Sequence, residues 1–91
     1  MYGEKMINVG QLIVESKRRN FKNKESTLSI LKLLNENKEF TKAKDNKTQI
    51  NILKNDYLTN ESFNENEYSV IKSLIYGLEL ESDPNKIQRK R

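Results

Sequence analysis

The residue types that most often carry out catalysis and bind metals are missing from this sequence. It contains no histidine and no cysteine, which removes the commonest general base, the commonest metal ligand and every thiolate nucleophile. Paired carboxylates can work as acid and base only where burial or close contact separates their pKa values. The carboxylates here are expected on the polar faces of helices. We therefore predict that the protein is not an enzyme and that it has no catalytic residues, no metal site and no cofactor.

The short motifs that build a site from backbone groups are also absent. The sequence has no glycine-rich phosphate loop, no Gly-x-Ser-x-Gly nucleophile elbow and no aspartate-rich calcium loop. Tyr57, Tyr68 and Tyr76 are expected at the edge of the core rather than in catalysis. Function is therefore expected to depend on binding.

Charged side chains are the remaining candidates for binding, and they are unevenly distributed. The formal net charge of +4 comes from a basic stretch over residues 1–59, an acidic stretch over residues 60–83 and a basic end over residues 84–91. The densest positive cluster is Lys17, Arg18, Arg19, Lys22 and Lys24. Such a cluster can attract nucleic-acid phosphates in a salt-dependent way. The alternative is a solvated helix end stabilised by the helix dipole.

Two further charged groups are candidates for contacts with a partner. The basic residues at the end of the chain form either a flexible solubilising tail or an arm that binds nucleic acid; they are Lys86, Arg89, Lys90 and Arg91. The acidic residues Glu79, Glu81 and Asp83 come at the C-terminal end of an expected helix, where the dipole disfavours negative charge. They indicate docking of a basic partner, or pairing with the tail or with residues 17–19.

The strongest expected helix covers residues 64–83. Asn64 and Glu67 have the spacing of a capping box, and Pro84 marks the end. The apolar stripe on one face consists of Tyr68, Ile71, Leu74, Ile75 and Leu78. A stripe this continuous must be covered by the rest of the chain.

Three weaker segments complete the expected architecture. Asn8 caps a helix to about residue 20, Ser26 or Thr27 begins a second helix to residue 39, and Thr48 caps a third over residues 49–57. The polar stretch 41–48 is either a loop, which we favour, or the exposed first turns of the third helix, and Phe21 is expected to fold back onto the core. The predicted core is Leu12, Ile13, Leu28, Leu31, Leu34, Leu53, Ile71, Leu74, Ile75 and Leu78. No alternation typical of strands competes.

Together these features predict an all-α fold: a small single-domain bundle of three to four helices over residues 1–84, followed by a basic flexible tail over residues 85–91. There is no apolar run near eighteen residues and no apolar block typical of a signal peptide. We therefore expect no membrane contact and a cytoplasmic location. The abundance of asparagine and lysine is compatible with an AT-rich genome, such as that of a phage or a low-GC bacterium.

The order of segments resembles the N-terminal helical domain of the YqeY proteins, which are related to the tail of the GatB subunit of tRNA-dependent amidotransferases. The matching pieces are residues 12–24, the run Ser-Thr-Leu-Ser-Ile-Leu-Lys-Leu-Leu at 26–34, Leu-Thr-Asn-Glu at 58–61 and Val-Ile-Lys-Ser-Leu-Ile at 70–75, ending at Glu81 and Ser82. The resemblance implies an all-α domain. Members of that family carry a second helical domain, thought to contribute to tRNA contact, which this sequence does not match.

Two functional hypotheses follow. The first is a small non-catalytic helical module that docks on a protein complex, of the kind a phage uses to modulate a host protein. The alternative is an accessory domain that binds nucleic acid, in a tRNA-related role, through residues 17–24 and the tail. The oligomeric state stays open.

Overall fold

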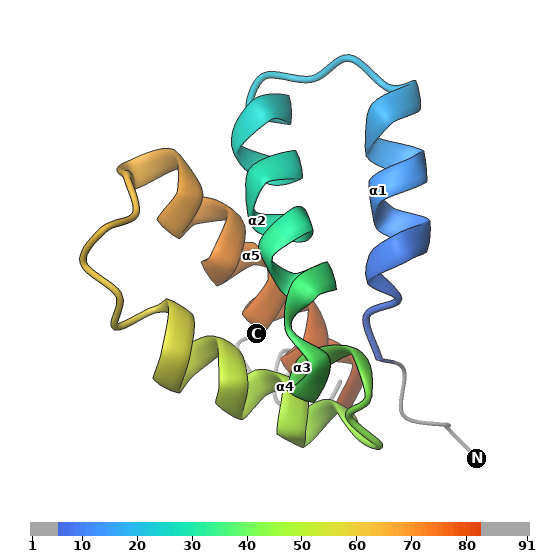
Figure 1. Cartoon of the computed structure of the whole chain (residues 1–91), viewed down its shortest axis with the longest axis vertical. Helices are drawn as coiled ribbons and strands as arrows, with labels where there is room; N and C mark the ends of the chain where they lie inside the picture. Colours follow the sequence, from blue (N-terminus) through green and yellow to red (C-terminus); the bar gives the residue numbers. More distant parts are fainter. Residues whose placement is uncertain (1–5, 83–91) are drawn as a thin grey trace, which may run out of the picture.

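A computed structural model of the chain describes residues 6–82, with side chains over 6–80, and these residues form a helical bundle (Figure 1). The elements are α1 (Val9–Arg18), α2 (Lys24–Glu36), α3 (Lys38–Thr41), α4 (Asn46–Ile52), the π-helix η1 (Leu53–Tyr57) and α5 (Glu65–Ser82). No strand occurs between residues 6 and 82, which confirms the all-α prediction. Five α-helices take the place of the predicted three to four. None of the helices in this range is long and apolar enough to cross a membrane.

Two polar caps account for the difference: one starts the additional helix α3, and the other starts α4, the expected third helix, earlier than predicted. Asn37 ends α2 and also starts α3, because its side-chain oxygen accepts a hydrogen bond from the Phe40 N–H at 3.2 Å. Asp45 caps α4 by accepting from the Thr48 N–H at 2.8 Å. Residues 42–45 form the predicted loop, residues 46–48 are instead the first turn of α4, and the predicted cap at Thr48 is wrong. Helix α2 also begins at Lys24 rather than at residues 26–27.

The caps of the first and last helices agree with the prediction. Asn8 accepts a hydrogen bond from the Gln11 N–H at 3.1 Å and so caps α1. At the start of α5, the Glu67 N–H donates to the Asn64 side chain at 2.8 Å, and the Asn64 N–H donates back to the Glu67 carboxylate at 3.0 Å. This reciprocal pair is the capping box, which satisfies backbone donors that have no partner inside the helix.

The helices pack in an arrangement that leaves α1 at one side of the bundle. In Figure 1, α1 and α2 run side by side as an antiparallel pair joined by residues 19–23. Helix α5 packs against α2, α4 and η1, whereas α1 packs mainly against α2. The side of α1 that is turned towards α5 is therefore only partly covered.

The core lies between α2, α4, η1 and α5, and Val9 of α1 and Phe40 of α3 are buried in it as well. Six of the ten predicted core residues are buried, namely Leu31, Leu34, Leu53, Ile71, Ile75 and Leu78. Leu12, Ile13 and Leu74 are only half-buried, although they pack against the core, because the α1 side of the bundle is open. Leu28 is also half-buried and lies outside the core cluster. The prediction missed Ile30 and Phe40, which are fully buried.

Candidate binding surfaces

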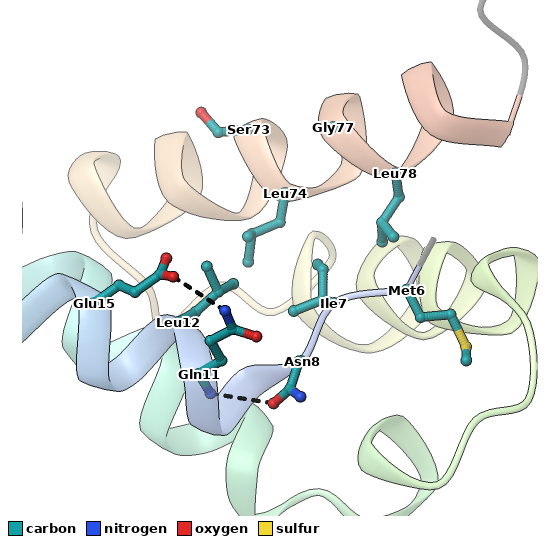
Figure 2. A pocket seen from close by; sticks show the side chains of 10 residues that line it. All are labelled: Met6, Ile7, Asn8, Gln11, Leu12, Glu15, Ser73, Leu74, Gly77 and Leu78. Atoms are coloured by element: carbon teal, nitrogen blue, oxygen red, sulfur yellow. Dashed lines mark hydrogen bonds between the residues drawn. The ribbon is translucent and has the colours of Figure 1, made fainter. Parts of the chain in front are cut away.

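An open groove of about 350 Å³ lies between the N-terminal half of α1 and the C-terminal half of α5 (Figure 2). It exists because α1 packs on α2 and leaves a gap towards α5. Its walls are mostly apolar, with a polar rim. The lining residues are Met6, Ile7, Asn8, Gln11, Leu12, Glu15, Ser73, Leu74, Gly77 and Leu78.

The apolar walls come from three different segments. Figure 2 shows Leu74 pointing from α5 towards Leu12 of α1, and Leu78 pointing from α5 towards the segment of Met6 and Ile7. Ile7 closes the floor from the segment that precedes α1. Met6, at the mouth, is 41% exposed. A concave surface of this size with apolar walls has the properties of a binding site.

The segment that carries Met6 and Ile7 is held in place by one buried amide. The Gln49 side chain accepts from the Ile7 N–H at 2.8 Å and donates to the Ile7 carbonyl at 3.2 Å. It also donates to the Phe40 carbonyl at 3.3 Å. Gln49 is 2% exposed, so these bonds replace water that the buried amide cannot reach. The floor of the groove is therefore fixed by α4.

The rim of the groove carries one formal charge. Glu15 is the only charged residue among those that line it, and its carboxylate accepts from the Gln11 side-chain amide at 3.2 Å. Ser73 is the only hydroxyl side chain among the lining residues. Among the described residues, no group of three His, Cys, Asp or Glu side chains could hold a metal ion.

Gly77 occupies an unusual place in the wall of the groove. A Cβ atom added to it would meet no other atom within 4 Å, so packing among the described residues does not require a glycine here. Glycine inside a helix costs about 0.5–1 kcal/mol relative to alanine. This position thus lowers the stability of α5 while leaving the groove wall without a side chain.

The predicted basic cluster gathers at the other end of α1, where residues 19–23 join α1 to α2. Lys17, Arg18, Arg19 and Lys22 are exposed, and no carboxylate among the described residues forms an ion pair with them. Lys24 is half-buried, and its ammonium group donates to the Lys17 carbonyl at 3.0 Å. Lys24 therefore also satisfies one of the free carbonyls at the end of α1.

Phe21 does not fold back onto the core as predicted. Helix α1 ends at Arg18 and α2 already starts at Lys24, so the connection only bridges two neighbouring helix ends. Phe21 consequently stays 41% exposed. It borders a second hollow of about 410 Å³, which is lined by Leu12, Glu15, Ser16, Arg19, Asn20 and Phe21.

The predicted acidic docking residues are only partly described. The Glu79 carboxylate forms an ion pair with the Lys54 ammonium group at 3.0 Å. Lys54 of η1 is not among the predicted partners of Glu79, which are the tail and residues 17–19. The side chain of Glu81 and the whole of Asp83 lie outside the described residues, as do Lys86, Arg89, Lys90, Arg91 and the end of the predicted domain.

The three tyrosines differ in their surroundings. Tyr57 is buried, and its hydroxyl accepts from the Asn37 side-chain amide at 3.1 Å. Tyr68 is half-buried, donates to the Asn60 carbonyl and meets the edge of Phe63. These two confirm the predicted position at the edge of the core. Tyr76 does not, because it is 54% exposed.

The groove itself was not predicted from sequence. Leu12 and Leu74 were assigned to a closed core, since an apolar residue at helical spacing gives no sign of whether a neighbouring helix covers it. Gly77 was the one available signal, as a glycine within a long amphipathic helix. Comparisons with protein-family models, with curated proteins and with solved structures find no match to this chain.

Proposed function

We propose that this protein is a small non-catalytic binding module that holds an amphipathic helix of a partner protein in the groove between α1 and α5. The observation that carries the proposal is a groove with apolar walls from both helices, which no described residue fills. A helix that enters such a groove contributes apolar side chains at positions i, i+3 or i+4, and i+7.

Charge complementarity favours a basic partner helix. Glu15 is the only charged residue in the lining, and the groove runs beside the C-terminal half of α5, where the helix dipole is negative. A lysine or arginine beside the apolar residues of the partner would lie near both the Glu15 carboxylate and the negative end of the α5 dipole. Glu79, which the sequence analysis assigned to docking, already pairs with Lys54 and is not part of this groove.

Gly77 fits the same proposal. A residue without a side chain lets the backbone of a partner approach α5 closely. Packing within the described residues does not explain why a glycine stands in α5 at a cost in helix stability. Close approach of a partner backbone would explain it.

The wider role that we propose is docking on a protein complex in the cytoplasm, in the manner of a phage protein that modulates a host protein. Small size and the absence of histidine and cysteine support a role without catalysis. The resemblance to the YqeY domain stays a prediction, and so does a tRNA-related role.

The proposal can be tested by selecting helical peptides from a randomised display library on the immobilised full-length protein. We expect selected peptides to share the apolar spacing and at least one basic residue. Met6→Arg should weaken their binding by about tenfold or more, which corresponds to about 1.4 kcal/mol. Leu33→Arg is the matched control, because Leu33 is 40% exposed, against 41% for Met6, and lies on α2 away from the groove.

Two results would contradict the proposal. The first is that selected peptides bind Met6→Arg as tightly as they bind the parent protein. The second is a parent protein that is dimeric in sedimentation analysis and becomes monomeric in Met6→Arg, because a second copy would then be the occupant of the groove.

A further inference from the structure

We infer that the end of the bundle where α1 joins α2 binds single-stranded nucleic acid, with phosphates on Lys17, Arg18, Arg19 and Lys22 and a base stacked on Phe21. This surface lies at the other end of α1 from the groove that holds the partner helix, and the two hollows share only Leu12 and Glu15. The inference therefore does not depend on the proposed function.

The charge at this end is concentrated and available. Four exposed cations lie on the last turn of α1 and on the connection, without ion-pair partners among the described residues. The carboxylates nearest in sequence are Glu15 and Glu25, so positive charge dominates locally. The Lys24 ammonium group offsets the negative end of the α1 dipole by donating to the Lys17 carbonyl. Adjacent cations on one surface attract a chain of phosphates.

Phe21 gives this surface a second property that nucleic acid can use. Phe40 is fully buried and Phe63 is half-buried against Tyr57 and Tyr68, whereas Phe21 is 41% exposed. Phe21 and Arg19 border the same hollow. An aromatic ring beside cations is the arrangement on which unpaired bases stack, and such stacking tolerates any base.

The shape of this end favours single strands over duplexes. Reading a duplex requires a helix or strand that enters a groove, and this end presents a short connection between two helix ends. A base is free to stack on a side chain only where it is unpaired. No ladder of side chains is placed to read base edges, so binding should not depend on sequence.

The inference can be tested by fluorescence anisotropy with labelled oligo-dT and oligo-U and the full-length chain. Four phosphate contacts predict that the logarithm of the association constant falls with the logarithm of the salt concentration with a slope of roughly −3, at about −0.7 per phosphate on a single strand. The double substitution Arg18→Glu, Arg19→Glu should abolish measurable binding. The double substitution Lys38→Glu, Lys42→Glu is the matched control, because it changes the net charge by the same amount. Both lysines are exposed, Lys38 in α3 and Lys42 at its C-terminal cap. This control should stay within about threefold of the parent.

Phe21→Ala separates stacking from simple charge attraction. It should weaken oligonucleotide binding by roughly 5- to 150-fold, the range for losing one stacked base, while the salt slope stays unchanged. Phe21→Trp should keep the affinity. Because Phe21 is exposed, circular dichroism should show all these variants folded.

Two outcomes would overturn the inference. If the α3 control loses as much affinity as the Arg18, Arg19 variant, only net charge is being measured. If polyglutamate displaces the oligonucleotide as well as unlabelled oligo-dT does, and Phe21→Ala binds like the parent, the surface recognises an acidic protein instead.

Discussion

The two ends of α1 form different kinds of surface, although a single helix carries both. Near its N-terminus, α1 faces α5 across an apolar groove with one carboxylate on the rim. Near its C-terminus, α1 meets the start of α2 at a group of exposed cations beside Phe21. Leu12 and Glu15 line both hollows and so form the boundary between them. A helix that packs mainly against one neighbour can thus expose two surfaces of different composition.

The largest effect should come from removing the support that both surfaces share. Leu34 is fully buried, and Leu34→Ala should lower the free energy of unfolding by about 2–5 kcal/mol. In a protein of this size, with a stability of roughly 5 kcal/mol, both binding activities should fall together. Urea unfolding followed by circular dichroism measures the loss. The neighbouring Leu33→Ala, at an exposed position, should cost less than about 0.5 kcal/mol; equal losses would mean that the buried face is assigned wrongly.

Gln49→Leu should affect the groove more than the basic end. It removes the Gln49 amide from the Ile7 N–H and the Ile7 carbonyl, whereas the Phe40 carbonyl keeps the Ala43 N–H, so we expect a loss of about 1–3 kcal/mol. Hydrogen exchange at the Ile7 amide should accelerate, and peptide binding should weaken while oligonucleotide binding is kept. Asn51→Leu, at an exposed amide of the same helix, is the control. An unchanged exchange rate at Ile7 would show that the amide does not fix the groove floor.

Gly77→Leu should separate stability from binding at the groove. Because the added side chain meets open space and leucine favours helix, stability should rise by roughly 0.5–1 kcal/mol. The same side chain would occupy the groove and weaken peptide binding by about tenfold, or about 1.4 kcal/mol. Gly10→Ala on α1, outside the groove lining, should raise stability without affecting binding. If the Gly77→Leu protein binds peptide as tightly as the parent does, Gly77 is not part of the peptide-binding site.

Asp45→Asn is expected to have a small effect on stability and none on either surface. The hydrogen bonds from the Thr48 hydroxyl and Thr48 N–H hold the pKa of the Asp45 carboxyl below its ordinary value of 3.8. The charged carboxylate therefore stabilises the folded state fully when the pH is above that ordinary pKa. This contribution is lost as the pH falls through the lower pKa of the folded state. The stability difference between Asp45→Asn and the parent should shrink over that acidic range in pH-dependent urea unfolding. A difference that does not change with pH would contradict this.

Sequence patterns predicted the parts of this fold that depend on neighbours along the chain. The capping box of α5 and the cap of α1 are spacings of three residues, and the basic cluster is a run of adjacent side chains. Helix α3 and the early start of α4 were missed because Asn37 lay inside the predicted second helix and Asp45 inside the predicted loop, although each caps the helix that follows it. Leu12 and Leu74 looked like core residues because their exposure depends on how far α1 stands from α5. That distance is set by packing on α2, which no local pattern contains.

Glu15→Gln tests most directly whether the two ends of α1 are separate surfaces of opposite preference. It keeps the size of the side chain and removes the one charge that borders both hollows. We expect it to weaken binding of a basic helical peptide and to strengthen binding of oligo-dT, each by roughly two- to fivefold, the scale of a partly exposed charge pair. Glu39→Gln, at an exposed residue of α3, should change neither affinity. If Glu15→Gln moves both affinities in the same direction, or leaves both unchanged, α1 does not divide two surfaces.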